Sequence, residues 1–293
     1  MERLVKINAN AKINLTLDIL GKRPDGYHEV AMVMQEILLH DTLTLTKQES
    51  GISLSIIVEG QKGELPADET NLCWRAAALL QKELGAGGVS IHLVKRIPMA
   101  AGLAGGSADA AAVLKGMDQL YGLQLSEERL CSLGAALGSD IPFCIMGGTM
   151  LATGRGEVLT RLPALPPTDV VLAKPGVGVS TAWAYKTYDA GYDGLHPDNA
   201  AMQEAVKAGS SRRAAELLCN VLEGVTAGKY EVISAYKELM LRQGAWGSMM
   251  SGSGPTVFGL APDADTAAGI ADALRRYDSG AAVFVTKTAA GRY

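Results

Sequence analysis

Residues 98–109, PMAAGLAGGSAD, have the composition of a loop that binds an anion. Gly102, Gly105, Gly106 and Ser107 occupy a turn between an expected strand and an expected helix, so side chains are absent where a ligand approaches. Backbone N–H groups can then point inward, and the helix adds about half a positive charge at its N-terminus. These features favour phosphate. The alternative is a plain strand-to-helix turn in which Ser107 caps the helix.

A second glycine-rich turn, SGSGP, covers residues 251–255 between two apolar segments. By itself this turn is as typical of an ordinary β-hairpin as of a ligand site. Two such loops from different halves of a chain can also close over one ligand from two sides.

The patterns that are missing exclude several classes of protein. The sequence has no G-x-x-x-x-G-K-[ST] loop and no G-x-G-x-x-G loop, which argues against a P-loop enzyme and against a dinucleotide-binding enzyme. Asp109 stands where the hydrolase elbow G-x-S-x-G would need its second glycine, and no H-R-D catalytic loop is present.

Charge and composition limit the partners. The formal net charge is −4, and no basic cluster stands out, so we expect no nucleic-acid partner. The amino-terminal residues have no apolar run, so we expect a cytoplasmic protein without a membrane partner. Neither the cysteines nor the histidines have metal-site spacing, so we expect no protein metal centre and reduced thiols. The cysteines are Cys73, Cys131, Cys144 and Cys219.

Hydrophobic periodicity in the first half predicts an α+β fold. Apolar residues alternate with polar ones over residues 12–20, which predicts a half-buried strand with Lys12 and Asn14 on its polar face. Further strands are expected at 30–39, 42–47, 52–58, 89–94 and 148–160. Helices are expected from Leu72, capped by Asn71 or Thr70, from Ser107, and after the cap Ser126.

The stretch 163–168, PALPPT, predicts a domain boundary, which gives domains at 1–162 and 163–293. The second half also alternates between helix and strand patterns. Strands are expected at 170–173, on both sides of the Gly-Ser-Gly turn within 246–260, and at 281–287. Helices are expected at 180–188, 198–208, 212–223, 229–243 and 263–276.

Three motifs in this order resemble the GHMP kinase superfamily, whose members phosphorylate small-molecule alcohols. They are NAKINL at 10–15, PMAAGLAGGSADAA at 98–111 and MMSGSGPTVFG at 249–259. The resemblance implies ATP and Mg²⁺ as cofactors. It also implies an N-terminal ATP-binding domain of ribosomal-S5-like type and a C-terminal α+β domain of ferredoxin-like type.

Within that superfamily, three further segments resemble one branch. AKINLTLDILGKRPDGYHE at 11–29, LGSDIPF at 137–143 and TGRGE at 153–157 are similar to kinases that phosphorylate the 2-hydroxyl of a cytidyl diphospho-sugar alcohol in non-mevalonate isoprenoid synthesis. A kinase of homoserine or mevalonate type, or a non-catalytic nucleotide sensor on the same scaffold, is the alternative. A monomer and a homodimer both remain open.

The resemblance implies Lys12 and Asp140 as the catalytic pair. Asp140 would orient the hydroxyl and finally deprotonate it, while Lys12 would fix Asp140 and stabilise charge on the transferring group. Without the motifs, the two residues read as a surface lysine and a turn aspartate. The implied ATP-binding residues are Pro98, Met99, Ala100, Ala101, Gly102, Leu103, Ala104, Gly105, Gly106, Ser107 and Ala108.

Substrate contacts follow from the same resemblance. Tyr27 would stack on the cytosine, His28 would make a polar contact with it, and Tyr185 would cover its other face. The sequence departs from the branch at Lys174 and Ser180, where histidine and proline are common, and a packing aromatic is the alternative for Tyr185. The remaining implied substrate residues are Asn14, Thr181, Gly252 and Ser253.

Overall fold

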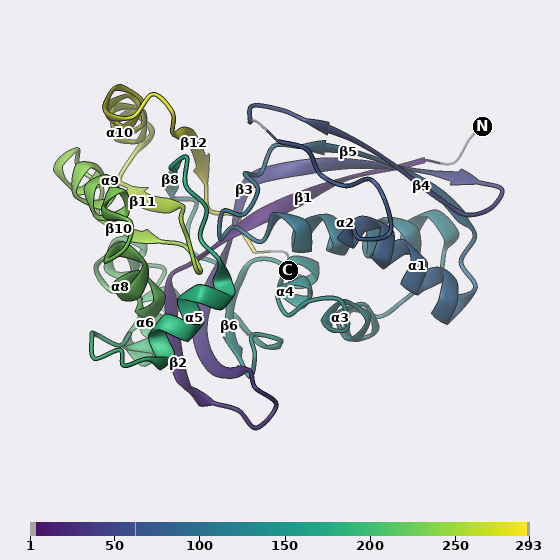
Figure 1. Ribbon diagram of the computed structural model, residues 1–293, viewed down its shortest axis with the longest axis horizontal. Helices are drawn as coiled ribbons and strands as arrows, with labels where there is room; N and C mark the ends of the chain where they lie inside the picture. The colour runs from purple at the N-terminus through teal and green to yellow at the C-terminus, as the bar shows by residue number, and fades with distance from the viewer. Residues whose placement is uncertain (1–3, 62, 292–293) are drawn as a thin grey trace. The chain divides into compact units, whose positions relative to one another are not determined.

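The computed structural model describes residues 4–61 and 63–291, and the chain divides by its contacts into two compact units (Figure 1). Unit 1 comprises three segments, which are the chain as far as Ala11, the segment Leu39–Met99 and the segment Ala104–Gly147. Unit 2 gathers Lys12–Leu38, Ala100–Leu103 and the chain from Gly148 onward. The strands β1 (Leu4–Asn14) and β3 (His28–Gln48) contribute residues to both units. The expected mixture of helix and strand is confirmed, and the predicted boundary after residue 162 stays a prediction.

Unit 1 is a sheet with helices packed on it. Its strand β5 (Gly88–Lys95) pairs antiparallel with residues 42–48 of β3 and parallel with β4 (Ile52–Val58). The helix α1 (Leu72–Leu84) packs against β4 and β5 and runs beside α2 (Gly105–Tyr121), as Figure 1 shows. Two shorter helices, α3 (Glu127–Ala135) and α4 (Ile141–Met146), pack on each other, and α4 also packs on α2.

Two of the predicted helix starts in unit 1 are confirmed. The side chain of Asn71 accepts from the N–H of Cys73 at the start of α1, and Ser126 accepts from the N–H of Arg129 at the start of α3. The predicted start of α2 at Ser107 is wrong. The helix begins at Gly105 because Ala104, at φ +56°, turns the chain without a side-chain cap, and Ser107 lies inside the first turn.

Unit 2 holds a sheet built around residues 28–38 of β3. The strand β2 (Thr16–Lys22) pairs antiparallel with β3 on one side, and β6 (Thr149–Thr153) pairs antiparallel with β3 in the register Met32 to Ala152. A hairpin of β6 and β7 (Val158–Leu162) replaces the single strand predicted at 148–160. A short strand, β9 (Cys219–Asn220), runs parallel to β2.

Unit 2 also holds an antiparallel sheet in the order β10-β11-β8-β12. The helices α9 (Glu231–Arg242) and α10 (Ala264–Tyr277) pack on this sheet. Its strands are β10 (Gly247–Met250), β11 (Val257–Ala261), β8 (Asp169–Lys174) and β12 (Ala282–Lys287). The other helices of this unit are α5 (Thr181–Asp189), α6 (Asn199–Lys207), α7 (Ser211–Glu216) and α8 (Val221–Ala227).

The single helix predicted over 212–223 is wrong. The helix α7 ends at Glu216, the chain then forms β9, and α8 begins at Val221. Asn220 makes this break: its backbone pairs with β2, and its side-chain oxygen accepts from the N–H of Leu222. A long-range strand pairing therefore overrides the helical periodicity of the segment.

The strand segment around Lys12 is buried on both faces, whereas the alternation predicted a half-buried strand. Polar side chains on the second face have partners from distant parts of the chain. Thr16, for example, donates to Asn199 Oδ1 over 2.5 Å and accepts from the N–H of Val33 over 2.9 Å. Alternation alone cannot separate a solvated face from a buried face whose polar groups are paired.

Candidate active site

Lys12 lies at the end of β1 with its ammonium group inside the protein. The residue is 4% exposed, and Nζ donates to Asn14 Oδ1 over 2.6 Å and to Gly102 O over 3.0 Å. The backbone N–H of Lys12 donates to Leu103 O over 3.2 Å. Burying a charge without acceptors costs several kcal/mol, so these oxygens contribute to the stability of the buried ammonium group. They also fix part of the glycine-rich loop to β1.

Gly102 brings the glycine-rich loop against the Gly-Ser-Gly turn. Its φ is +74°, and a Cβ added to it would lie 2.2 Å from the backbone oxygen of Ser251. Ser251 Oγ donates to Gly102 O over 3.0 Å, so this carbonyl accepts from Lys12 and from Ser251. A Cβ on Gly252 would lie 3.3 Å from Lys12 Nζ. Both predicted loops therefore meet at Lys12 through residues that have no side chain.

Two residues that the sequence analysis missed hold the Gly-Ser-Gly turn: Asn220, the N-cap of α8, and Glu223 within that helix. Asn220 Nδ2 donates to Met250 O over 2.9 Å and to Gly252 O over 2.8 Å. Glu223 Oε2 accepts from the N–H of Met250 over 2.6 Å, and its other oxygen pairs with Lys237. Asn220 and Glu223 therefore hold both the end of β10 and the turn that follows it.

A sequence signal for this pair did exist. An asparagine followed three residues later by a glutamate is typical of a helix N-terminus, and Asn220 and Glu223 have that spacing. The helix predicted over 212–223 concealed the signal, because it placed both residues inside one helix.

The predicted base-binding residues His28 and Tyr185 lie together in unit 2. Their ring centroids are 4.8 Å apart at an interplanar angle of 36°. Asp189, which the sequence analysis also missed, contacts His28 Nε2 over 2.7 Å and accepts from Lys22 Nζ over 2.8 Å. Hydrogen bonds from Lys22 and from His28 hold the pKa of Asp189 below its usual value. The His28 ring is thus fixed by a carboxylate on one edge and by an aromatic ring on its face.

The other predicted substrate residues in unit 2 have neighbours of their own. Tyr27 is exposed, and the Arg155 guanidinium lies 4.9 Å from the centroid of its ring. Thr181 and Ser253 share a hydroxyl–hydroxyl hydrogen bond of 2.8 Å. Asn14, besides accepting from Lys12, donates to the sulfur of Met32 over 3.2 Å. Their roles in binding stay predictions.

Asp140 belongs to unit 1 and stands at the N-cap position of α4, half-buried and in an αR conformation. Its side chain makes no capping hydrogen bond to the helix. Because Lys12 lies in unit 2, the pairing of Lys12 with Asp140 stays a prediction. The predicted ATP-binding residues are divided in the same way: Ala100–Leu103 belong to unit 2, and the others belong to unit 1.

The start of α2 in unit 1 fits a phosphate group. The first N–H groups of a helix have no partner within the helix, and they point toward any anion at its end. Gly106 is exposed, and a Cβ added there would meet only Leu72 Cδ1, at 3.5 Å. The residues present therefore suit ATP phosphates. Among residues 4–61 and 63–291, no group of three or more His, Cys, Asp or Glu side chains is placed to hold a metal ion.

Comparison with known protein families agrees with these features. The model of the GHMP kinases N terminal domain matches residues 71–148, which include the start of α2 and Asp140. The model of the GHMP kinases C terminal domain matches residues 202–280, which include Asn220 and the Gly-Ser-Gly turn. The chain belongs to the GHMP kinase family, and it is a small-molecule kinase that uses ATP.

The most similar relatives share one name, 4-diphosphocytidyl-2-C-methyl-D-erythritol kinase. The protein of that name from Acetivibrio thermocellus is 48% identical over 257 residues, which cover 87% of this chain and 89% of the relative. The one from Synechococcus sp. is 50% identical over 292 residues, which cover 96% of this chain and 93% of the relative.

Solved structures agree as well. A crystal structure of 4-(cytidine 5'-diphospho)-2C-methyl-D-erythritol kinase is 34% identical, with a TM-score of 0.82 over 98% of this chain and all of that one. A crystal structure of L. major mevalonate kinase in complex with R-mevalonate is 16% identical, with a TM-score of 0.80 over 100% of this chain and 98% of that one, and it shares the fold. In the part of the chain that the structure describes, no helix has the length and apolar character needed to cross a bilayer.

Proposed function

We propose that this chain transfers the γ-phosphoryl group of ATP to the 2-hydroxyl of 4-diphosphocytidyl-2-C-methyl-D-erythritol, a step of non-mevalonate isoprenoid synthesis. The names of relatives that match nearly the whole chain at about half identity support this substrate. The observation that carries the proposal is the contact of Lys12 Nζ with Gly102 O, because it joins the strand of the first motif to the glycine-rich loop.

In the proposed reaction, the 2-hydroxyl oxygen forms a bond to the γ-phosphorus, and the bond from that phosphorus to the β,γ-bridging oxygen breaks. ADP leaves, and the hydroxyl proton passes to the Asp140 carboxylate. Phosphoryl transfer has a loose transition state in most analyses, so the proton leaves late and positioning dominates. A weakly basic carboxylate is adequate for that role. Lys12 is held by Asn14 and Gly102 and supplies positive charge near the transferring group.

ATP would lie with its phosphates at the start of α2 and along the glycine-rich loop, held by backbone N–H groups. Mg²⁺ is part of the proposal, and when bound with ATP it would neutralise part of the negative charge of the phosphates. The loop itself contributes no charged side chain between Pro98 and Ala108. Backbone amides and the helix terminus therefore carry the recognition of the phosphates.

The direct test is ATP consumption by the purified chain with and without 4-diphosphocytidyl-2-C-methyl-D-erythritol. We expect turnover that depends on this alcohol and exceeds turnover with homoserine or mevalonate by at least about 100-fold, because buried polar groups reject an analogue that leaves them unpaired. Equal or faster turnover with either of the other alcohols would remove the proposed substrate. ATP binding without turnover of any of the three would favour the nucleotide sensor.

Tyr185→Ala is expected to raise KM for the cytidyl substrate about five- to 100-fold, because stacking on a base is worth about 1–3 kcal/mol. KM for ATP should stay within about twofold of its original value. Tyr188→Ala is the matched control, since Tyr188 lies on the same helix and stacks on Tyr192 instead. An unchanged KM for the cytidyl substrate would leave Tyr185 only the task of packing against His28.

A further inference from the structure

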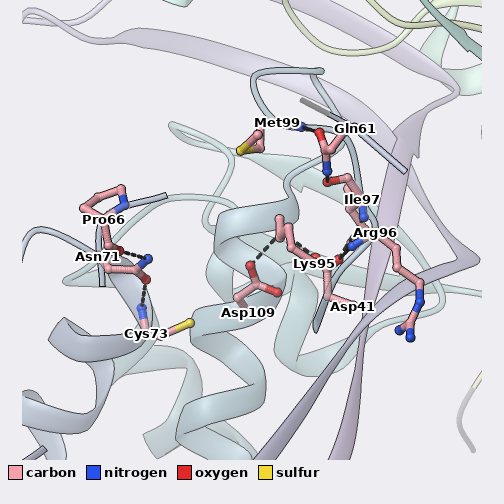
Figure 2. A network of polar contacts seen from close by, with 10 residues as sticks. All are labelled: Asp41, Gln61, Pro66, Asn71, Cys73, Lys95, Arg96, Ile97, Met99 and Asp109. Atoms are coloured by element: carbon pink, nitrogen blue, oxygen red, sulfur yellow. Dashed lines mark hydrogen bonds and ion pairs between the residues drawn. The ribbon is translucent and has the colours of Figure 1, made fainter. Parts of the chain in front are cut away.

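A buried ionic cluster lies in unit 1, where it joins the end of β5 to the first turn of α2 (Figure 2). Lys95, the last residue of β5, pairs with Asp41 of β3, and its Nζ lies 2.7 Å from Asp109 Oδ2 on α2. The side chains of Lys95, Asp41 and Asp109 are at most 4% exposed. Nothing in the proposed reaction uses these three residues.

Asp41 fixes the chain where it leaves β5 toward the loop. Its Oδ1 accepts from the N–H of Arg96 over 2.5 Å and from the N–H of Ile97 over 2.8 Å. Gln61 holds the next residues, donating to Ile97 O over 3.1 Å and accepting from the N–H of Met99 over 3.0 Å. Figure 2 shows these bonds in succession along the segment that enters the loop.

Lys95 also fixes the point where the chain leaves the loop. A Cβ added to Gly105, the first residue of α2, would lie 2.8 Å from Lys95 Nζ and 2.9 Å from Ile97 Cγ2. The ammonium group therefore packs directly against the backbone of Gly105. Since Asp109 stands one helical turn further along α2 and pairs with the same ammonium, the first turn of the helix is held at both ends.

The cluster has one ammonium group for two carboxyl groups, so one carboxyl group has no positive charge to balance it. Asp109 Oδ1 is buried and has no hydrogen-bond partner. Burial raises the pKa of Asp109 well above its ordinary value; Lys95 opposes this shift, and Asp41 adds to it. Burial by itself lowers the pKa of Lys95, but the two carboxylates outweigh it and raise that pKa. A protonated Asp109 beside the Lys95–Asp41 ion pair makes the cluster neutral, which is the state that a dry site favours.

We propose that Asp41, Lys95 and Asp109 are positioning residues, which hold the end of β5 and the first turn of α2 in the arrangement that binds the phosphates of ATP. This inference rests on the proposed function, because it assigns the ATP phosphates to the start of α2. Lys95 packs against Gly105, the first residue of α2, and the proposal assigns none of the three side chains a contact with a phosphate. It acts on nucleotide affinity through the backbone of Gly105.

Lys95→Met and Gly105→Ala test the contact from its two sides. The probe is the non-hydrolysable ATP analogue AMP-PNP, with Kd measured by calorimetry. Each variant is expected to raise Kd at least about tenfold, because small displacements of a binding group have large effects. The double variant should raise Kd by less than the product of the two factors, since methionine is shorter than lysine and makes room for the added methyl group.

Gly116→Ala is the matched control, because it lies on the same helix and its Cβ would meet Leu45 Cδ1 at 2.9 Å. We expect it to lower Tm and to leave Kd for AMP-PNP within about twofold. If Lys95→Met does not fold, the Kd values of Gly105→Ala and of the control still test the positioning role. Wild-type Kd in Gly105→Ala would overturn the positioning role, whereas absence of AMP-PNP binding by the unaltered chain would overturn the proposed function.

The charge of Asp109 gives a separate prediction on stability. A carboxyl group whose pKa is raised in the folded state contributes stability below its ordinary pKa of 3.8, and this contribution is lost as pH rises through the folded value. Asp109→Asn does not titrate at this position, so its free energy of unfolding should rise relative to that of the original chain as pH increases from about 4 to neutral.

Denaturant unfolding at several pH values measures that difference. The other titratable groups that face Asp109 are Asp41 from β3, Lys95 from β5 and Cys73 from α1, and the variant keeps all three. A difference in unfolding free energy that is the same at pH 4 and at pH 7 would mean that Asp109 is ionised in the folded protein. The neutral state of the cluster would then be wrong, whereas the positioning role of Lys95 is tested by the Kd measurements above.

Discussion

We expect Lys12→Met, Asp140→Asn and the variant that carries both changes each to lower kcat about 10²- to 10⁴-fold. The kcat of the double variant should lie no more than about threefold below that of the poorer single variant. When two residues act as a unit on one proton and one phosphoryl group, the first substitution already removes their shared contribution to kcat. The second substitution then adds little, so the two losses in kcat do not multiply. Steady-state kinetics with saturating ATP and cytidyl substrate measure the kcat of each variant.

The physical reason differs between the two changes. Asp140→Asn keeps the shape of the side chain and removes the acceptor for the hydroxyl proton, so KM for both substrates should stay within about threefold. Lys12→Met removes the donor that Asn14 Oδ1 and Gly102 O accept from, so it should also raise KM for ATP. Gly102 O keeps the hydrogen bond from Ser251, whereas Asn14 Oδ1 loses its donor, and leaving a buried acceptor without its donor costs about 1–3 kcal/mol.

Lys6→Met is the control for this series, because Lys6 is exposed on the same strand, β1. Its kcat and both KM values should match those of the original chain. Fully multiplicative losses in the double variant would show that Lys12 and Asp140 act independently. Near-normal turnover of Asp140→Asn would remove Asp140 from proton transfer altogether.

Gly102→Ala is expected to reduce kcat/KM by at least about 100-fold and to lower Tm. The added Cβ would lie 2.2 Å from the backbone oxygen of Ser251 and 3.2 Å from the backbone nitrogen of Gly254, and backbone atoms cannot rotate away as a side chain can. A displacement of about 1 Å in a binding loop can cost about 100-fold in rate. Because Gly102 O accepts from Lys12, the displacement also moves the ammonium group.

Gly122→Ala separates this crowding from backbone strain. Gly122 has φ +65°, close to the +74° of Gly102, and a Cβ there meets nothing within 4 Å. The control therefore measures the cost of the left-handed conformation alone, about 1–2 kcal/mol for a residue with a side chain. If Gly102→Ala and Gly122→Ala lower Tm by the same amount and both keep full activity, the close approach of the glycine-rich loop to the Gly-Ser-Gly turn has no role in catalysis.

The parts of the fold that the sequence predicted correctly have local causes. Asn71 and Ser126 cap their helices with their own side chains, so residue type and position are sufficient to find those helix starts. The start of α2 depends instead on the left-handed conformation of Ala104, which an alanine does not indicate. The break at Asn220 depends on pairing with β2, about 200 residues away in the chain, and no local window contains that information.

In the candidate site, too, the residues that the sequence identified lie in local motifs, and the residues that it missed depend on long-range contacts. Lys12, Gly102 and Ser253 lie in motifs that residue types make visible. Asp189 and Asn220 act through contacts with residues far away in the chain, and the sequence around either residue does not identify those partners. Motifs therefore located the groups expected to touch ligands, and only the structure located the groups that hold them.

The carbonyl oxygen of Gly102 accepts from two residues that lie 90 and 149 positions away in the chain. A chimera of two related kinases thus inherits this junction intact only when the stretches around Lys12, Gly102 and Ser251 suit one another, whichever parent supplied them. Crossovers that separate β1 from the glycine-rich loop, or that loop from β10, put this compatibility at risk. A single crossover within α10, which follows all three stretches in the chain, should accordingly be tolerated better than one between β1 and β10.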